Sequence, residues 1–423
     1  MEINDLLKGV DCSCGRKHKC DIRHIAIGKN AIDRLGDITA EFQNILLVAD
    51  ENTYAAAGRQ TENTLKGKTL SKVIFPGKPL LIPNETAIAR VKRELAGVQL
   101  LIGIGSGVIQ DLCKYVSHTE GIPYYIVATA PSMDGYASTG AAMILEGMKV
   151  TVAAGVPAAI VADTQVLKEA PMEMIRAGYG DIVGKFSALN DWRLSQLVNG
   201  EYFCRYIYDL TMDMVRKTLQ LAHGLQNREE ESVKVLMEAL VVVGIAMSFA
   251  GSSRPASGSE HHLSHFFEIT GIVGGEGYFP HGIDVAYSTV MTASLREKLL
   301  AQPWPDTRYR LSTGEYVAKM QKIYGPVAQG CISLQQQVGF YEKDMLPVYK
   351  AKEPQIREIL AQMPKAEEIR QMLTAGGLDM AQFYDLYAPQ KIRDAIFYAK
   401  DLKDRYTVLW LYYDLFGLES NKN

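Results

Sequence analysis

The stretch that decides the fold is Val98-Gln-Leu-Leu-Ile-Gly-Ile-Gly-Ser-Gly-Val-Ile-Gln-Asp111. Its first half is a short, continuous apolar run, which is typical of a strand buried on both faces of a parallel sheet. Its second half is rich in glycine, which lets backbone amides approach a phosphate group, and the following helix adds its N-terminal dipole. The spacing departs from G-x-G-x-x-G because position 108 is valine. A glycine-rich turn of this kind is also common as plain structure.

Similar apolar runs recur on both sides of this stretch. Strands are predicted at residues 22–27, 44–50, 72–75, 98–104, 124–128 and 158–162, with a helix at 84–96 and a hairpin at 142–153. Short strands that alternate with helical segments predict an α/β domain with a Rossmann-like parallel sheet. Asp50 and the segment from Thr129 to Ser138 each follow a strand, at the edge where such sheets bind ligands.

The pattern changes at about Asp163, after which the segments become long and helical. Helices are predicted at residues 166–177, 191–199, 206–227, 232–250, 317–324, 356–363 and 388–402. We therefore expect two domains, an α/β domain over residues 1–165 and an all-helical domain over residues 166–423. The apolar run from Ala239 to Ala250 is too short to cross a bilayer and predicts a buried helix.

The composition is that of an ordinary globular protein. The chain has 423 residues, 47% of them hydrophobic and 22% charged, with a net charge of -3. This balance gives no reason to expect a nucleic-acid or anionic-membrane partner, although a small anionic substrate needs only a local basic pocket. No basic segment leads into an apolar run at the N-terminus, so we expect a cytoplasmic protein.

Six cysteines are present, and in a large cytoplasmic protein they are expected to be reduced thiols. Cys12, Cys14, His18 and Cys20 place four soft metal ligands within nine residues. A structural zinc knuckle is one interpretation of this segment. Its spacing matches none of the usual C-x-x-C patterns, so a terminal loop is the favoured interpretation.

Four of the eight histidines, His261, His262, His265 and His281, crowd into 21 residues. His261 and His265 are four residues apart and share one face of a helix. Imidazole is a ligand for zinc, nickel or iron, so the group is a candidate metal site. The alternative is a helix N-terminus with surface histidines. Asp181, considered alone, is expected to be a helix N-cap.

The order of the motifs is more specific than any of them alone. The Gly105 loop is followed by Thr-Ala-Pro-Ser-Met-Asp-Gly-Tyr-Ala-Ser (129–138), Gly-Tyr-Gly-Asp (178–181), Ser-Gly-Ser-Glu-His (257–261) and His-Gly (281–282). From about Cys12 to the helices after His281, the chain resembles the sn-glycerol-1-phosphate dehydrogenases. It is most similar to their bacterial branch, which includes an enzyme encoded with arabinose-utilisation genes. Iron-type alcohol dehydrogenases, glycerol dehydrogenase and dehydroquinate synthase belong to the same superfamily.

The resemblance implies a dehydroquinate synthase-like fold and assigns roles to individual residues. It implies that Asp181, His261 and His281 hold one divalent metal, that Asp134, Asp181 and His265 face the substrate, and that His262 has no role. The implied cofactor contacts are Asp50, Gly105, Ser106, Gly107, Val108, Asp111, Thr129, Ser132 and Ser138. Lys185 and Arg254 are our own candidates for the substrate phosphate, chosen for their charge and nearness to the motifs.

The implied reaction is the reversible reduction of dihydroxyacetone phosphate to sn-glycerol 1-phosphate with NADH or NADPH, which would serve phospholipid biosynthesis. The metal, nickel or zinc or else iron, would polarise the ketone. Asp134 and His265 are the expected catalytic residues, with His265 passing a proton to the nascent alkoxide. Asp50 favours NADH, because a carboxylate repels a 2′-phosphate. We also expect a homodimer.

Three alternatives remain open from the residues. A glycerol dehydrogenase-like enzyme would act on a polyol without phosphate. A dehydroquinate synthase-like lyase would fit the spacing from His261 to Glu268, but those enzymes carry a glutamate where this chain has Asp181. A non-catalytic nucleotide-binding protein would be expected to lack a metal ligand. The chain also departs from the family in the segment His281-Gly282-Ile283-Asp284, where many relatives have His-Gly-Glu, and in a longer connection between His261 and His281.

Overall fold

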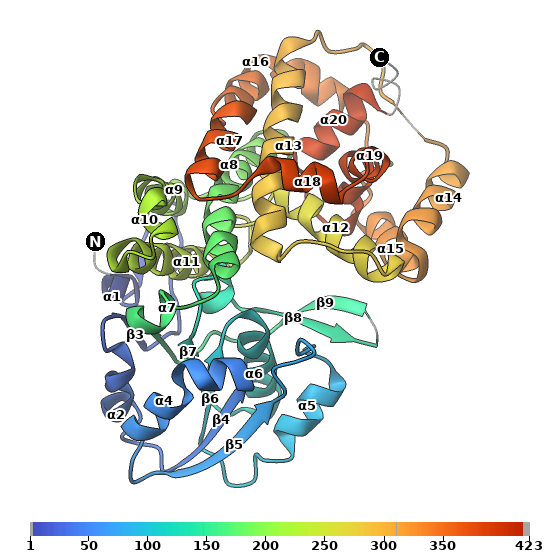
Figure 1. Ribbon diagram of the computed structural model, residues 1–423. Helices are drawn as coiled ribbons and strands as arrows, with labels where there is room; N and C mark the ends of the chain where they lie inside the picture. Colours follow the sequence, from blue (N-terminus) through green and yellow to red (C-terminus); the bar gives the residue numbers. More distant parts are fainter. Residues whose placement is uncertain (1–2, 147, 310, 418–423) are drawn as a thin grey trace. The chain divides into compact units, whose positions relative to one another are not determined.

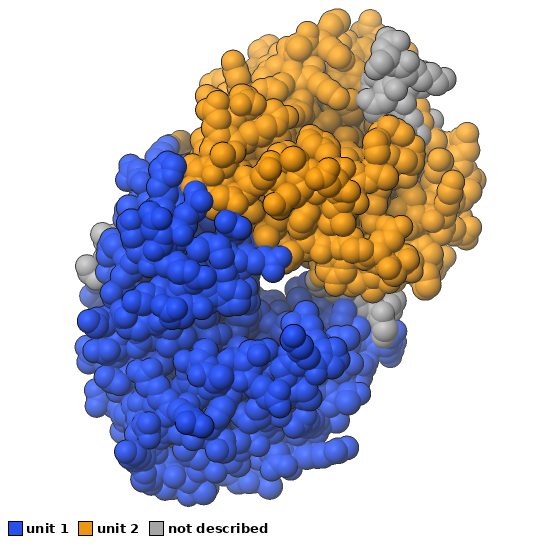
Figure 2. All heavy atoms as spheres, viewed as in Figure 1, with its two compact units in different colours: residues 1–182, 209–253 blue, residues 183–208, 254–423 orange. Residues whose placement is uncertain are grey.

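The computed structural model describes residues 3–146, 148–309 and 311–417. The chain forms two compact units (Figure 2). Unit 1 comprises Met1–Ile182 and Asp209–Ser253, and unit 2 comprises Val183–Tyr208 and Arg254–Asn423. This division differs from the expected boundary at residues 165/166, because the helices of residues 209–253 group with the sheet and not with the other helices.

A six-stranded, fully parallel sheet is the framework of unit 1 (Figure 1). Its order is β3-β10-β7-β6-β4-β5. The strands are β3 (His24–Gly28), β4 (Asn44–Asp50), β5 (Thr69–Phe75), β6 (Leu100–Gly105), β7 (Tyr124–Ala128) and β10 (Ala159–Asp163). All six predicted strands are therefore confirmed, with small shifts at their ends.

Both faces of this sheet are buried, which explains the continuous apolar runs. Along β4, Leu47 and Ala49 join one apolar cluster, and Leu46 and Val48 join the cluster on the opposite face. The first cluster includes residues next to α2 (Leu35–Ile38) and α4 (Arg59–Thr64), and the second includes residues of α5 (Glu85–Lys92) and α6 (Gly107–Glu120). The antiparallel hairpin of β8 (Gly140–Leu145) and β9 (Met148–Ala153) packs against α6.

The remaining elements of unit 1 are α1 (Ile3–Leu6), the hairpin of β1 (Val10–Asp11) and β2 (Lys17–His18), α7 (Thr164–Leu167), α9 (Arg205–Gln220), α10 (Ala222–Gln226) and α11 (Glu230–Ala250). Of these, α1, α7 and α11 contact the edge strand β3. Within the described part of the chain, α11 is the one helix long and apolar enough to span a membrane, and 78% of its most apolar window is buried in the protein. The prediction of a buried helix here is confirmed.

Helix α8 (Met172–Asn199) corrects two expectations. The segment predicted as one helix at residues 166–177 is broken at Pro171, whose carbonyl accepts the first bonds of α8. The helix then continues without a break through residues 191–199, so Asp181 lies in its middle and is not an N-cap. Position 178 in this helix requires glycine, because a Cβ there would lie 1.9 Å from the carbonyl oxygen of Pro131.

Unit 2 is helical, as predicted. Besides the second half of α8 it contains α12 (Ser259–Gly274), α13 (His281–Ala301), α14 (Thr313–Tyr324), α15 (Ala328–Val338), α16 (Leu346–Ala361), α17 (Ala366–Ala375), α18 (Met380–Leu386), α19 (Pro389–Tyr398) and α20 (Val408–Phe416). Helices α12 and α13 follow each other along the chain and pack together.

A buried ion pair joins the helices of unit 2. The guanidinium of Arg296 on α13 lies 2.7 Å from Asp191 on α8, and both side chains are at most 2% exposed. Asp191 also accepts hydrogen bonds from the backbone N–H of Ser259 at the start of α12 and of Val408 at the start of α20. One carboxylate therefore satisfies two helix N-termini and one buried cation.

Replacing Arg296 with methionine is expected to destabilise unit 2 by about 3–5 kcal/mol, because Asp191 would remain as a buried charge without its cation. All three tryptophans, Trp192, Trp304 and Trp410, lie in unit 2, so tryptophan fluorescence during denaturant unfolding measures the effect. The matched control is Arg370→Met, whose partner Glu367 is exposed, and which should cost less than about 1 kcal/mol. Equal costs for the two variants would contradict the assignment.

Candidate active site

Three predicted metal ligands come together in the structure. Asp181 on α8, His261 on α12 and His281 at the start of α13 each offer one ligand atom, and these atoms lie within 4.8 Å of one another. The ring centroids of His261 and His281 are 5.0 Å apart. The group therefore has the size of a single-ion site, made of one carboxylate and two imidazoles.

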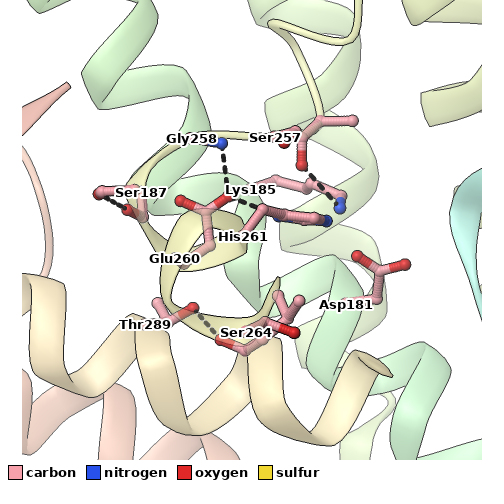
Figure 3. Close-up of polar contacts among 12 residues, drawn as sticks. Asp181, Lys185, Ser187, Ser257, Gly258, Glu260, His261, Ser264 and Thr289 are labelled. Atoms are coloured by element: carbon pink, nitrogen blue, oxygen red, sulfur yellow. Dashed lines mark hydrogen bonds and ion pairs between the residues drawn. The ribbon is translucent and has the colours of Figure 1, made fainter. Parts of the chain in front are cut away.

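The His261 ring is oriented by a neighbour along the chain. Its Nδ1 lies 2.7 Å from Oε1 of Glu260, and the same oxygen accepts the backbone N–H of Gly258 at 2.7 Å. With Nδ1 engaged, Nε2 is the ring nitrogen that can coordinate a metal. Figure 3 shows the ring extending toward Asp181 and Lys185. A carboxylate behind a ligand histidine fixes the ring orientation and raises its basicity.

The protonation states suit metal binding. Burial, together with the charges of Lys185 and His281, holds the pKa of His261 well below its ordinary value, so the ring is neutral at neutral pH. Burial also raises the pKa of Glu260 to about 7, with the nearby Asp191 adding to the effect. A neutral imidazole is the form that binds zinc, nickel or iron.

His281 and Asp181 are also held by neighbours. Nδ1 of His281 lies 3.4 Å from the Ser264 hydroxyl, one turn along α12 from the Glu260 position. Asp181 is fully buried, and its Oδ2 accepts the backbone N–H of Asp134 at 3.0 Å. Asp134, a predicted catalytic residue, therefore lies directly beside a predicted metal ligand. The boundary between the units falls just after Asp181, inside α8, and the helix itself is continuous.

The other two histidines of the cluster differ in their surroundings. His265 lies one turn after His261 on α12, half-buried, with its ring centroid 5.4 Å from that of His281. His262 points elsewhere and is fully buried, and burial holds its pKa well below the ordinary value. Neither of its ring nitrogens has a hydrogen-bond partner among the described residues.

The two basic candidates also differ. Lys185, one turn after Asp181 on α8, is fully buried, and its ammonium group donates to the carbonyl of Ala256 at 3.1 Å. Arg254 forms a bidentate pair with Glu201, with distances of 2.7 and 2.5 Å. It also donates to the carbonyl of Tyr406 and to Ser195. This geometry favours Lys185 and gives Arg254 a structural role.

The predicted cofactor residues gather at the carboxyl ends of three adjacent strands. Gly105 ends β6, Asp50 ends β4 and Thr129 follows β7. The backbone N–H of Thr129 donates to the Gly105 carbonyl at 3.1 Å. Gly107 opens α6, and a Cβ there would meet nothing closer than Met133 at 3.8 Å. The first amides of α6 are therefore approachable, as a phosphate group requires.

Several side chains at this edge of the sheet form hydrogen bonds or ion pairs within the protein. Asp50 caps α3 (Glu51–Thr53) by accepting the Thr53 N–H at 2.9 Å. Asp111 pairs with Lys114, and Ser138 donates to the Gly135 carbonyl. Val108 and Ser132 lie in the same two loops, at the start of α6 and before Asp134.

Two buried residues near the site were not predicted. Lys114 of α6 donates to the carbonyls of Gly135 and Gly140 and so holds the loop that contains Asp134. Burial lowers the pKa of Lys114, and the Asp111 carboxylate opposes this effect. Glu260 belongs to the Ser-Gly-Ser-Glu-His motif. Its position directly before His261, a predicted metal ligand, could have indicated its contact with the His261 ring.

Asp284, three residues after His281 in the segment expected to differ from the family, is also buried. Its carboxylate accepts the hydroxyl of Tyr387 at 2.9 and 3.0 Å, and burial raises its pKa well above the ordinary value. Tyr387 belongs to the segment between α18 and α19, so this hydrogen bond joins that segment to α13 within unit 2.

Comparisons with known proteins agree with this architecture. Residues 26–171 match the family model described as iron-containing alcohol dehydrogenase. A glycerol-1-phosphate dehydrogenase acting with NAD(P)+ from Halalkalibacterium halodurans is 34% identical over 69% of this chain and 77% of its own. One from Geobacillus stearothermophilus is 30% identical over 96% of both chains. A probable glycerol dehydrogenase from Sinorhizobium meliloti 1021 shares the fold, with a TM-score of 0.60 at 17% identity over 92% of both chains.

Removal of one ligand tests the metal group. His281→Ala is expected to lower the divalent metal content of the purified protein by one ion per chain, because two donors hold an ion far more weakly than three. Elemental analysis after dialysis measures this content. The matched control, His265→Ala, removes a neighbouring imidazole outside the three-ligand group and should keep the metal. A loss of metal in both variants, or in neither, would refute the ligand assignment.

Proposed function

The chain belongs to the family of NAD(P)-dependent glycerol-1-phosphate dehydrogenases, and we propose that it reduces dihydroxyacetone phosphate to sn-glycerol 1-phosphate, reversibly, at a metal held by Asp181, His261 and His281. The family fixes the reaction class as oxidation and reduction of a polyol phosphate. The convergence of one carboxylate and two imidazoles within 4.8 Å is the observation that carries the finer proposal.

The donor set fits a divalent metal of the zinc, nickel or iron type. When bound, such an ion supplies Lewis-acid polarisation of a carbonyl oxygen. Glu260 keeps the His261 ring in the orientation and tautomer that this role needs, and the Ser264 hydroxyl contacts Nδ1 of His281. Burial of His261 excludes a competing proton from the ring at neutral pH.

We assign the substrate phosphate to Lys185. Its ammonium group lies within a fully buried stretch of α8, one turn from Asp181, so a bound anion would meet it in a poorly solvated environment. Such an environment strengthens attraction between opposite charges.

We assign the proton transfer to His265. It shares a helix face with His261 and is half-buried, so it can exchange protons with water. Transfer of its proton to the substrate oxygen would neutralise the charge left when hydride reaches the carbonyl carbon. Asp134, whose backbone amide donates to Asp181, would help to position the substrate.

The dinucleotide would bind along the carboxyl edge of the sheet. The first amides of α6, around Gly107, suit its pyrophosphate. Asp50 ends β4 at the position where a carboxylate accepts a ribose hydroxyl, which favours NADH over NADPH. The nicotinamide supplies the hydride, and the protein supplies position and electrostatics.

Substrate assays test the proposal directly. Dihydroxyacetone phosphate should be reduced with one NADH consumed per turnover, and glycerol 1-phosphate should be oxidised with a kcat/KM at least about 100-fold above that of glycerol or the 3-phosphate enantiomer. A spectrophotometric NADH assay with the four compounds side by side measures this. Phosphate release without net NADH change, or equal rates with glycerol, would refute the proposal.

The variant Lys185→Met isolates the phosphate contact. We expect the KM for dihydroxyacetone phosphate to rise about 10- to 100-fold, the loss of one charge-assisted hydrogen bond, while the KM for phosphate-free dihydroxyacetone stays unchanged. A general disturbance of the fold would affect both substrates. The control is Lys350→Met, an exposed lysine paired with Asp306, which should change neither KM.

A further inference from the structure

A second group of metal-ligand side chains lies outside the proposed active site. Cys12, Cys14, His18 and Cys204 each offer one ligand atom, and these atoms lie within 4.8 Å of one another. We propose that they form a structural zinc site. The proposal is independent of the proposed function, because none of the four residues belongs to the active site.

The size of the group fits zinc. In a tetrahedral site with Zn–S near 2.3 Å and Zn–N near 2.0–2.1 Å, a sulfur and a nitrogen ligand lie about 3.6 Å apart. The Sγ of Cys14 and Nε2 of His18 are 3.5 Å apart. Three thiolates and one imidazole make a closed set of four, which is typical of structural zinc and leaves no position for a substrate.

The N-terminal hairpin places three of the four ligands. Strands β1 and β2 pair Val10 with His18, and the turn between them is closed by hydrogen bonds from Cys12 to the Arg16 carbonyl and from Gly15 to the Cys12 carbonyl. Gly15 has a φ of +83°, which favours glycine. The tight turn brings Cys12, Cys14 and His18 to one side, although their spacing matches no C-x-x-C pattern.

His18 is prepared to act as a ligand. The side chain is 1% exposed, and its Nδ1 lies 3.1 Å from the carbonyl oxygen of Phe249 on α11. The ring also stacks on Phe249, with centroids 5.4 Å apart. A carbonyl can only accept, so Nδ1 carries the hydrogen and Nε2 presents its lone pair toward Cys14. Zinc-bound histidines commonly donate the N–H of their other ring nitrogen to a backbone carbonyl in this way.

Cys204 completes the group from a distant part of the chain. It directly precedes α9, and its carbonyl accepts the N–H of Tyr208 in the first turn. A helix N-terminus favours the thiolate that zinc requires. Cys204 itself falls in the Val183–Tyr208 segment, and α9 continues from it without a break into the residues of unit 1. Cys20, the fourth ligand suggested by the sequence, is not a member of the group.

The test combines metal content with a spectroscopic signature of thiolate ligation. We expect the intact protein to bind two divalent ions per chain and, after loading with Co²⁺, to show thiolate-to-cobalt charge-transfer absorption. The active-site group contains no sulfur and cannot produce this band. Cys14→Ser should lower the content by one ion and weaken the band, whereas Cys20→Ser and His281→Ala should both retain it.

Three results would overturn the proposal. The first is the absence of a thiolate band in the cobalt-loaded wild-type protein, which needs no variant and therefore does not depend on the folding of Cys14→Ser. The second is a metal content that Cys14→Ser leaves unchanged. The third is a disulfide between two of the three cysteines, found by mass spectrometry of the unreduced protein purified with zinc.

Discussion

The ion pair between Asp191 and Arg296 is the constraint on which the active-site geometry depends. Asp191 lies on α8, Arg296 on α13, and the Asp191 carboxylate also binds the first amide of α12. These are the three helices that carry Asp181, His281 and His261. A metal site tolerates errors of only a few tenths of an ångström in its donors. A buried charge pair with saturated hydrogen bonds supplies that precision, since either partner alone would be strongly unfavourable.

Polar groups nearer the Asp181, His261 and His281 group also make more than one contact each. Glu260 binds both its own helix start and the His261 ring, and Lys114 binds two carbonyls of the loop that presents Asp134. Each buried charge therefore holds a segment of backbone as well as a side chain. In a region with little water, these contacts fix positions before any substrate arrives, which is how preorganised sites lower activation barriers.

Much of this architecture could be predicted from the sequence. Buried parallel strands need apolar residues at every position, so their runs are visible. The order of the motifs identified the family and singled out Asp181, His261 and His281, which the structure brings within reach of one another. The continuity of α8 could not be predicted, because Gly178 and Gly180 resemble a break until the Pro131 carbonyl is seen beside Gly178. Cys204 could not be predicted either, since it is far from Cys14 in sequence and only the folded chain joins them. Arg254 carried the right charge, but its partner Glu201 was not visible beforehand.

Unit 1 is built from two separate segments of the chain, because residues 209–253 belong to it although residues 183–208 belong to unit 2. The core helix α11 lies in the second of these segments. During synthesis, the parallel sheet is therefore complete by Asp163, before α11 can pack against the edge strand β3 and the turn at Asp134–Ala137. For the time needed to translate that interval, an apolar surface of the nascent chain stays exposed. Neither unit is one uninterrupted segment of the chain, so each is completed only after part of the other has been synthesised.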